Sequence, residues 1–347
     1  MTSRQIVYDT LEHRSPARAP RQMWTLPWAE WNYPEEMARL RQNFPADFGG
    51  VDFTLAQPTI AHGDMYRHGE AVDEWGCRFT NIHEGVIGEV KNPLIPAEDE
   101  DWDNVDRIHI PVELLSFDEE TINAGCRASD KFMMCGCCPR PFEQLQFIRG
   151  TENLMMDLMD PPPKMLEFMG RMHTFYCELL EKWARTGVDA LNFMDDWGSQ
   201  RSLLINPALW KKMFLPMYRD FINIAHSHGK KIFMHSDGYI LDIIPLLAEA
   251  GLDAVNSQLF CMGLENMKHL KGKITFWGEM DRQHLLPHGT EAEIRQAVRD
   301  VYNTLWDNGG CIAQLEFGPG AKPENVEATF DEWNKVSSRA DVEVRIC

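Results

Sequence analysis

The chain has 347 residues, of which 44% are hydrophobic and 25% are charged, so it can bury one large core. Its formal net charge of -19 argues against nucleic acid or an anionic membrane as a partner, because binding phosphates needs a basic surface. It has no apolar run of about 18 residues and no apolar secretory segment at its start. Its nine cysteines form no disulfide-like framework. We expect a cytoplasmic protein.

The first 110 residues differ from the rest of the chain in their pattern of apolar and polar residues. A short helix is predicted over residues 8–12, followed by a proline-interrupted loop that contains Trp24, Trp28, Trp31 and Tyr33. Residues 63–93 have the pattern of antiparallel hairpins, with glycines at the reversals. No flexible linker separates this region from the remainder of the chain. We therefore expect a single domain, residues 1–347, with residues 1–110 as an N-terminal elaboration.

Short apolar runs and amphipathic helical stretches alternate along the remaining chain. The runs are 132–134, 190–194, 231–234, 254–255, 274–277 and 312–315, and stretches such as 207–228 and 291–308 separate them. Apolar strands that are each followed by polar residues and then a helix predict a (β/α)8 barrel (TIM barrel), with its active site at the carboxyl ends of the strands. The alternative is a doubly wound sheet. That fold would bring a glycine-rich phosphate loop, and neither G-x-G-x-x-G nor G-x-x-x-x-G-K occurs.

His235-Ser236-Asp237-Gly238 follows the run 231–234. An imidazole and a carboxylate two residues apart at a strand end can converge on one cation, and the glycine lets the backbone turn sharply. The alternative is a strand-end histidine beside an aspartate that caps the next helix.

Cys135-Gly136-Cys137-Cys138 follows the run 132–134. No second cysteine pair completes a four-thiolate zinc site. Packing at a strand end and a place in the pocket wall both remain open for Cys135, Cys137 and Cys138.

Several further segments, in their order along the chain, resemble the uroporphyrinogen decarboxylase superfamily, whose members are (β/α)8 barrels. They are Asp73-Glu74-Trp75-Gly76, Arg149 to Leu154, Asp160-Pro161-Pro162, Ile205 to Trp210 with Pro216, the His235 strand, and Lys322 to Val326. The resemblance extends over nearly the whole chain.

Two branches of this superfamily compete. Decarboxylases bind a polycarboxylate tetrapyrrole through Arg-Gln-Ala-Gly-Arg just after the first barrel strand. Here Arg21-Gln22 lies within the strand, and an aromatic, uncharged segment follows, ending at Trp28. The loss of carboxylate-pairing arginines argues against that substrate.

The other branch comprises zinc-dependent methyltransferases that exchange a methyl group with a corrinoid (cobalamin) protein. Members that act on coenzyme M have His-x-Cys, and a later cysteine seven residues before a proline. The corresponding positions here are His235, Asp237 and Glu316, the last seven residues before Pro323. The resemblance thus implies a zinc site in which carboxylates replace thiolates.

A histidine with two carboxylates makes a harder Lewis acid, which suits an oxygen atom. We therefore expect the methyl donor to be a small methylated molecule, with a methoxylated aromatic as the best candidate (O-demethylation), and the acceptor to be a corrinoid on a partner protein. The alternatives are a decarboxylase-like lyase with a smaller substrate, a methylcobamide:thiol methyltransferase, and a non-catalytic binding protein. The possibility of a homodimer is left open.

The remaining site residues are placed around this metal. Asp195 and Asp196 are expected to act in catalysis, one of them by orienting His235, or to cap the helix after Trp197. Glu279 is expected to be a fourth ligand or a proton donor. A flat slot for an aromatic ring is predicted from Trp24, Trp28 and Trp197, at least one of which is expected to be core, and polar substrate contacts from Gln200, Gln258 and Asp281.

Overall fold

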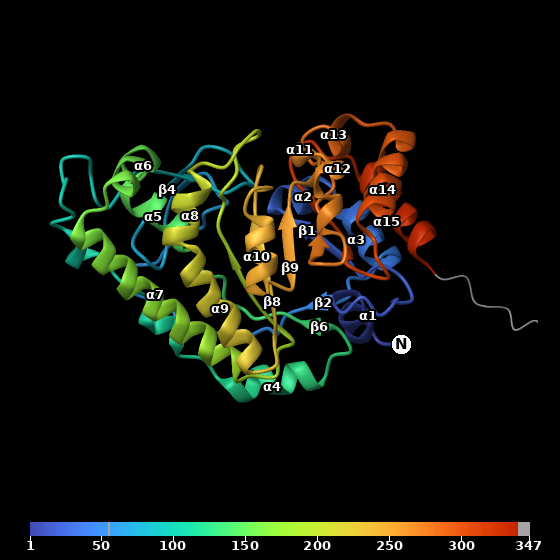
Figure 1. The fold of residues 1–347 in the computed structure, drawn as a ribbon, viewed down its shortest axis with the longest axis horizontal. Coiled ribbons are helices and arrows are strands. Elements are labelled where there is room, and N and C mark those ends of the chain that lie inside the picture. Colours follow the sequence, from blue (N-terminus) through green and yellow to red (C-terminus); the bar gives the residue numbers. More distant parts are fainter. Residues whose placement is uncertain (55, 339–347) are drawn as a thin grey trace, which may run out of the picture.

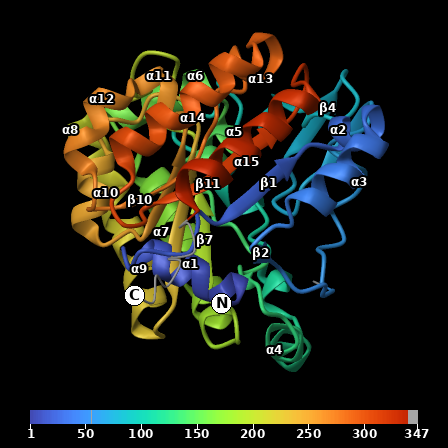
Figure 2. The ribbon, with the colours of Figure 1, turned by 90° about the vertical axis from the view of Figure 1, so that its right-hand side faces the viewer.

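The computed structural model describes residues 1–54 and 56–338, and its centre is a barrel of parallel strands. A six-stranded sheet runs in the order β1-β11-β10-β9-β8-β7, and a two-stranded sheet pairs β2 with β6. The amide of Asp47 donates to the carbonyl of Arg21 (2.9 Å), and a parallel bridge joins Met134 to Ala190. These bonds connect the small sheet to both edges of the large one, which confirms the predicted (β/α)8 barrel (Figure 2). The strands are β1 (Arg21–Thr25), β2 (Phe48–Gly49), β6 (Phe132–Met133), β7 (Ala190–Met194), β8 (Lys231–Ser236), β9 (Ala254–Ser257), β10 (Thr275–Trp277) and β11 (Cys311–Phe317).

Helices cover the outside of the barrel, with the long α7 on one side and the pair α14 and α15 on the other (Figure 1). They are α1 (Ser3–Leu11), α2 (Pro27–Asn32), α3 (Pro34–Asn43), α4 (Glu119–Arg127), α5 (Pro141–Arg149), α6 (Thr151–Met159), α7 (Pro163–Ala184), α8 (Pro207–Met213), α9 (Leu215–Ser227), α10 (Ile244–Ala250), α11 (Leu259–Met262), α12 (Leu264–Met267), α13 (Leu285–His288), α14 (Glu291–Leu305) and α15 (Pro323–Ser337). No helix of the described chain is long and apolar enough to cross a membrane.

The predicted loop around Trp28 is wrong. Residues 27–32 and 34–43 form α2 and α3, because Pro27 and Pro34 each occupy a first-turn position, where the missing amide hydrogen costs nothing. Likewise, the predicted helical stretch 207–228 is split at Phe214 into α8 and α9, and Pro216 lies in the first turn of α9.

The antiparallel hairpins predicted in residues 63–93 are confirmed. They form a three-stranded sheet of β3 (Gly69–Val72), β4 (Arg78–Asn81) and β5 (Glu89–Asn92). Three short 3-10 helices complete the fold: η1 (Val105–Arg107), η2 (Val112–Leu115) and η3 (Lys268–Leu270).

An aromatic layer fills the barrel below the carboxyl ends of its strands. Phe233 of β8 makes edge-on contacts with Phe48 and Trp277, with ring centroids 6.2 and 5.0 Å apart, and Phe132 packs in the same cluster. Above this layer Trp24 contacts both Trp277 (5.0 Å) and the ring of His235 (5.2 Å). The packed layer therefore forms a rigid floor beneath the strand ends where His235 lies.

Candidate active site

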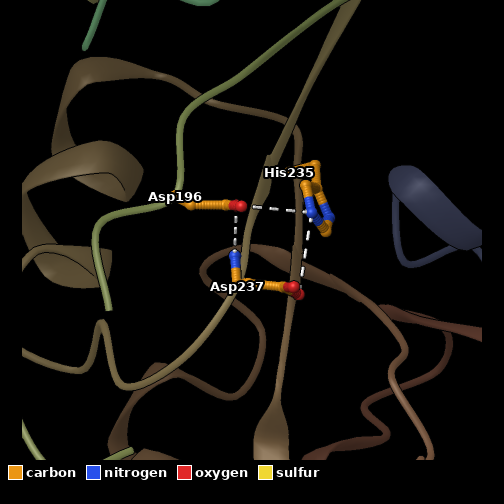
Figure 3. Close-up of side chains that lie close together, drawn as sticks. All are labelled: Asp196, His235 and Asp237. Carbon is orange, nitrogen blue, oxygen red and sulfur yellow. Dashed lines mark hydrogen bonds and ion pairs between the residues drawn. The ribbon is translucent and has the colours of Figure 1, made fainter. Parts of the chain in front are cut away.

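At the end of β8 the imidazole of His235 faces two carboxylates. Its Nε2 lies 3.6 Å from Oδ1 of Asp196 and 3.7 Å from Oδ1 of Asp237 (Figure 3). These distances are too long for hydrogen bonds, yet a cation with ligand bonds of about 2.0–2.2 Å fits between such atoms. Among the described residues, these three form the only group of histidine, cysteine and acidic side chains whose ligand atoms all lie within 4.8 Å of one another.

Asn256 of β9 fixes the ring of His235. The amide nitrogen of Asn256 donates to Oε1 of Gln314 (2.9 Å) and to the carbonyl of Trp277, so its Oδ1 is left to accept. That oxygen lies 2.6 Å from Nδ1 of His235, which must then carry the ring proton. In a neutral ring Nε2 is then the unprotonated nitrogen, and its lone pair is directed towards Asp196 and Asp237, as in a metal-ligating histidine.

Asn256 therefore binds the second ring nitrogen, instead of Asp195 or Asp196. Sequence reasoning noted Asn256 only as a polar residue at a strand end, and that position was the available signal. Asp195 lies elsewhere: it is fully buried, and it accepts from the Tyr218 hydroxyl (2.5 Å) and from the amide of Glu143 (2.8 Å). Burial raises the pKa of Asp195 well above its ordinary value, although these bonds lower it in part.

Tight backbone contact between two loops places Asp196 and Asp237. Gly238 has a φ of 77°, and a Cβ added there would lie 2.2 Å from the carbonyl oxygen of Gly198. This approach lets the amide of Gly198 donate to the carbonyl of Asp237 (3.1 Å) and the amide of Asp237 donate to Oδ1 of Asp196 (2.9 Å). Glycine at position 238 is thus required for the geometry of the acidic pair.

Arg282 joins Glu316 to the group around His235. Its guanidinium binds Oε1 of Glu316 (2.9 Å) and Oδ2 of Asp237. The guanidinium of Arg282 therefore links Glu316 to Asp237. Glu316 does not belong to the group around His235, whose third member is Asp196. The other oxygen of Asp237, Oδ1, is buried and has no hydrogen-bond partner in the described part of the chain.

Glu279 is 2% exposed, and neither of its carboxyl oxygens has a hydrogen-bond partner among residues 1–54 and 56–338. Its closest cation is Arg282, 3.7 Å away. Burial raises the pKa of Glu279 well above its ordinary value, and Arg282 offsets this only in part. The side chain therefore favours its protonated form, which can donate a proton.

Arg282 lies in the walls of three cavities, and two of them contain most of the sequence-predicted polar residues. One, of about 390 Å³, is lined by Asp196, His235, Asp237 and Glu316; we call it the central cavity. The other, of about 340 Å³, is lined by Gln200, Gln258, Glu279 and Asp281, with Arg282 in the walls of both. The sequence-predicted polar residues are thus divided between two adjoining spaces.

The three predicted tryptophans do not form one slot. Trp24 lies against His235, whereas Trp28 packs on Tyr33 with centroids 5.7 Å apart. Trp197 is fully buried and stacks on Phe142 at 3.9 Å, so it is the expected core member. The aromatic lining of the central cavity comes instead from Tyr66, Phe79 and Phe147, which sequence reasoning missed.

The central cavity is acidic. Its arginines, Arg140 and Arg282, are already paired, Arg140 with Glu143 at 3.0 Å and Arg282 with Asp237 and Glu316. The carboxyl groups that line it are Asp73, Glu74, Glu143, Asp196, Asp237 and Glu316. Six acidic groups against two paired arginines favour a bound cation.

The comparisons with known proteins agree with this fold. Residues 72–336 match the uroporphyrinogen decarboxylase family, which is well over half of the chain. The chain belongs to this family. Among solved structures, a methyltransferase from Methanosarcina mazei is similar over 97% of this chain and 99% of that one, with 12% identity and a TM-score of 0.64. A 3-keto-D-glucoside 4-epimerase from E. coli (11% identity, 64% of this chain and 84% of that one) reaches a TM-score of only 0.40. No curated protein matches the sequence.

Proposed function

We propose that this member of the uroporphyrinogen decarboxylase family is a zinc-dependent methyltransferase, which moves a methyl group from a small methylated donor to a corrinoid on a separate protein. The observation that carries the proposal is the position of His235 Nε2, which lies near two carboxylates in an acidic cavity while Asn256 binds the other ring nitrogen. The similarity in fold to a methyltransferase from Methanosarcina mazei, over 97% of this chain, supports the proposal.

The residues fit a zinc ion. His235 supplies a nitrogen ligand, and the unpartnered Oδ1 of Asp237 supplies an oxygen ligand. The third ligand would be Asp196, which lies close to His235 and Asp237 here, or Glu316, which the sequence resemblance implies. Binding through Glu316 would require Arg282 to release it. When bound, the ion would supply Lewis acidity to the leaving atom of the donor.

The donor we favour is a methoxylated aromatic molecule. Nitrogen and carboxylate ligands suit an ether oxygen better than a sulfur atom. Tyr66, Phe79 and Phe147 line the central cavity and can hold an aromatic ring. Because the acceptor belongs to another protein, the methyl carbon must face the open end of the cavity, and no nucleophile from this chain is needed.

The acidic lining argues against the polycarboxylate substrate of the decarboxylases. A substrate with several carboxylates needs free arginines, and Arg140 and Arg282 are both engaged by carboxylates of the chain. A polyanion would also be repelled by the remaining acidic groups.

Substitution of the central histidine tests the proposal. His235→Ala should lose stoichiometric zinc and, in the same preparation, lose methylation of added cob(I)alamin by a methoxyarene. His269→Ala is the matched control, because that histidine is exposed on η3 and its one hydrogen bond among the described residues is to the carbonyl of Asn266. If His235→Ala retains full zinc, the assigned ligand is wrong. If wild-type protein binds zinc but methylates no cobalt with any donor, the proposed function is wrong.

A further inference from the structure

The loop between β6 and α5 brings two thiols together. Sγ of Cys137 lies 3.8 Å from Sγ of Cys135, and the Cys137 thiol donates to the Cys135 sulfur. Asn192 holds the pair in place: its Oδ1 lies 3.3 Å from the Cys135 sulfur, and its amide nitrogen donates to the Cys137 carbonyl (3.2 Å). Neither thiol takes part in the site at His235.

The glycine between the two cysteines keeps their backbone close to the core. A Cβ at Gly136 would lie 2.2 Å from the ring of Phe53 and 2.9 Å from that of Trp183. The chain bends at Gly136, and the two cysteine side chains face each other across this bend. The two sulfurs need to approach by roughly 1.8 Å to reach the disulfide length of about 2.05 Å, which rotation of the side chains can supply.

A separate cavity reaches Cys137, whereas Cys135 lies buried behind it. It has a volume of about 250 Å³, and Cys137 and Cys138 line it together with Glu74 and Arg140. Glu74 and Arg140 also line the central cavity, so the two spaces share a wall.

The two thiols differ in acidity. Burial raises the pKa of the Cys135 thiol, but hydrogen bonds from the Cys137 thiol and from backbone amides outweigh it, so the pKa falls below its ordinary value. Burial and the neighbouring Cys135 raise the pKa of Cys137 well above its ordinary value. Two adjacent thiols of unequal acidity are the arrangement found in disulfide-exchanging pairs.

We infer that Cys135 and Cys137 form a redox-active dithiol that closes to a reversible disulfide by exchange with a small-molecule disulfide. Cys137 is the less acidic of the two thiols, but it is the one that lines the cavity and so meets the reagent first. It loses its proton and attacks one sulfur of the reagent, giving a mixed disulfide and one released thiolate. Cys135 then attacks the Cys137 sulfur and expels the second thiolate. Both electrons pass from the dithiol to the reagent, and its two protons end on the two released thiols.

Arg140 connects the loop that carries this bond to the central cavity. That residue lies three positions after Cys137, and its guanidinium binds Glu143 of the central cavity at 3.0 Å. Closure replaces the hydrogen bond between Cys137 and Cys135 with a covalent bond, in the same loop that carries Arg140. The oxidation state of the dithiol can therefore affect the position of Arg140 in the wall of the central cavity.

The test equilibrates the folded wild-type protein with a series of 2-hydroxyethyl disulfide and 2-mercaptoethanol ratios, followed by acid quench, alkylation and mass spectrometry. We expect a loss of two hydrogen atoms, a bond mapped between Cys135 and Cys137, and full reversal by excess 2-mercaptoethanol. Cys137→Ser should abolish the intramolecular bond. Cys138→Ser is the matched control and should retain it, because this neighbouring thiol lines the same cavity.

Three results would overturn the inference: both cysteines stay alkylatable at the most oxidising ratio, the bond maps to Cys137 and Cys138, or a stable mixed disulfide is the end product. Thermal unfolding of each variant shows whether it is folded, and Cys135→Ala provides a second variant if Cys137→Ser is not. The readout needs neither zinc nor methyl transfer, so its failure is independent of the proposed function.

Discussion

Removing the side chain of Asn256 should weaken zinc binding without removing any proposed ligand. In Asn256→Ala the Nδ1 of His235 loses its acceptor 2.6 Å away, so both ring tautomers become accessible and the ring can turn. Loss of such an outer partner typically costs 10–100-fold in metal affinity, or about 1.4–2.7 kcal/mol. Oε1 of Gln314 and the carbonyl of Trp277 also lose a donor, which should lower the free energy of unfolding by about 1–3 kcal/mol.

Competition with a chromophoric chelator measures the zinc affinity, and urea unfolding of the metal-free protein measures the stability. Ser257→Ala is the matched control, since Ser257 is the next residue of β9 and is fully buried, and its hydroxyl has no partner within the described residues. It should leave zinc affinity unchanged. A folded Asn256→Ala with wild-type zinc affinity, or an equal loss in Ser257→Ala, would refute the role assigned to Asn256.

Three further predictions concern the loop contact, a buried carboxyl and the donor. Gly238→Ala should lower the free energy of unfolding by more than about 3 kcal/mol in urea unfolding, because the added Cβ would clash with Gly198. Gly229→Ala is the control: it has a φ of 67° but open space around it, so it should cost only about 1–2 kcal/mol. Equal costs would contradict the contact between Gly238 and Gly198. Burial raises the pKa of Asp73 from 3.8 to about 6. The folded state therefore keeps a proton that the unfolded state has lost, so stability should fall by up to about 3 kcal/mol as pH rises from about 4 to about 6, and Asp73→Asn should remove this slope in unfolding experiments across that range. Finally, 4-methoxyphenol should have a KM about tenfold or more below that of 4-methoxybenzoate, since both arginines of the central cavity are paired; an equal or lower KM for the benzoate would contradict the charge argument.

The barrel was predictable because most of its strands are apolar along their whole length. Runs such as 190–194 and 231–234 lie between the aromatic floor and the covering helices, so both of their faces are buried. The strand β2 could not be predicted in the same way, since only Phe48 and Gly49 belong to it. The helix at Pro27 was missed because a proline can mark either a break or a helix start.

The site was predictable only where it depends on local sequence. His235 and Asp237 are two residues apart on one strand end, so their convergence follows from the fold class. The contacts of Asn256, Arg282 and Glu316 depend on which side chains of neighbouring strands meet across the barrel. That register is set by packing between segments far apart in the sequence, which a single chain does not reveal. The same holds for Trp197, which follows a strand end but turns into the core.

Transfer of a labelled methyl group tests the central claim most directly. Zinc-loaded protein is mixed with cob(I)alamin and 4-methoxyphenol whose methoxy carbon is ¹³C, and a single turnover is followed by visible absorbance and ¹³C NMR. The label should appear on cobalt with one equivalent of hydroquinone, and His235→Ala should form neither product. Cobalt methylation that proceeds equally well in His235→Ala, or hydroquinone formed without label on cobalt, would contradict this claim.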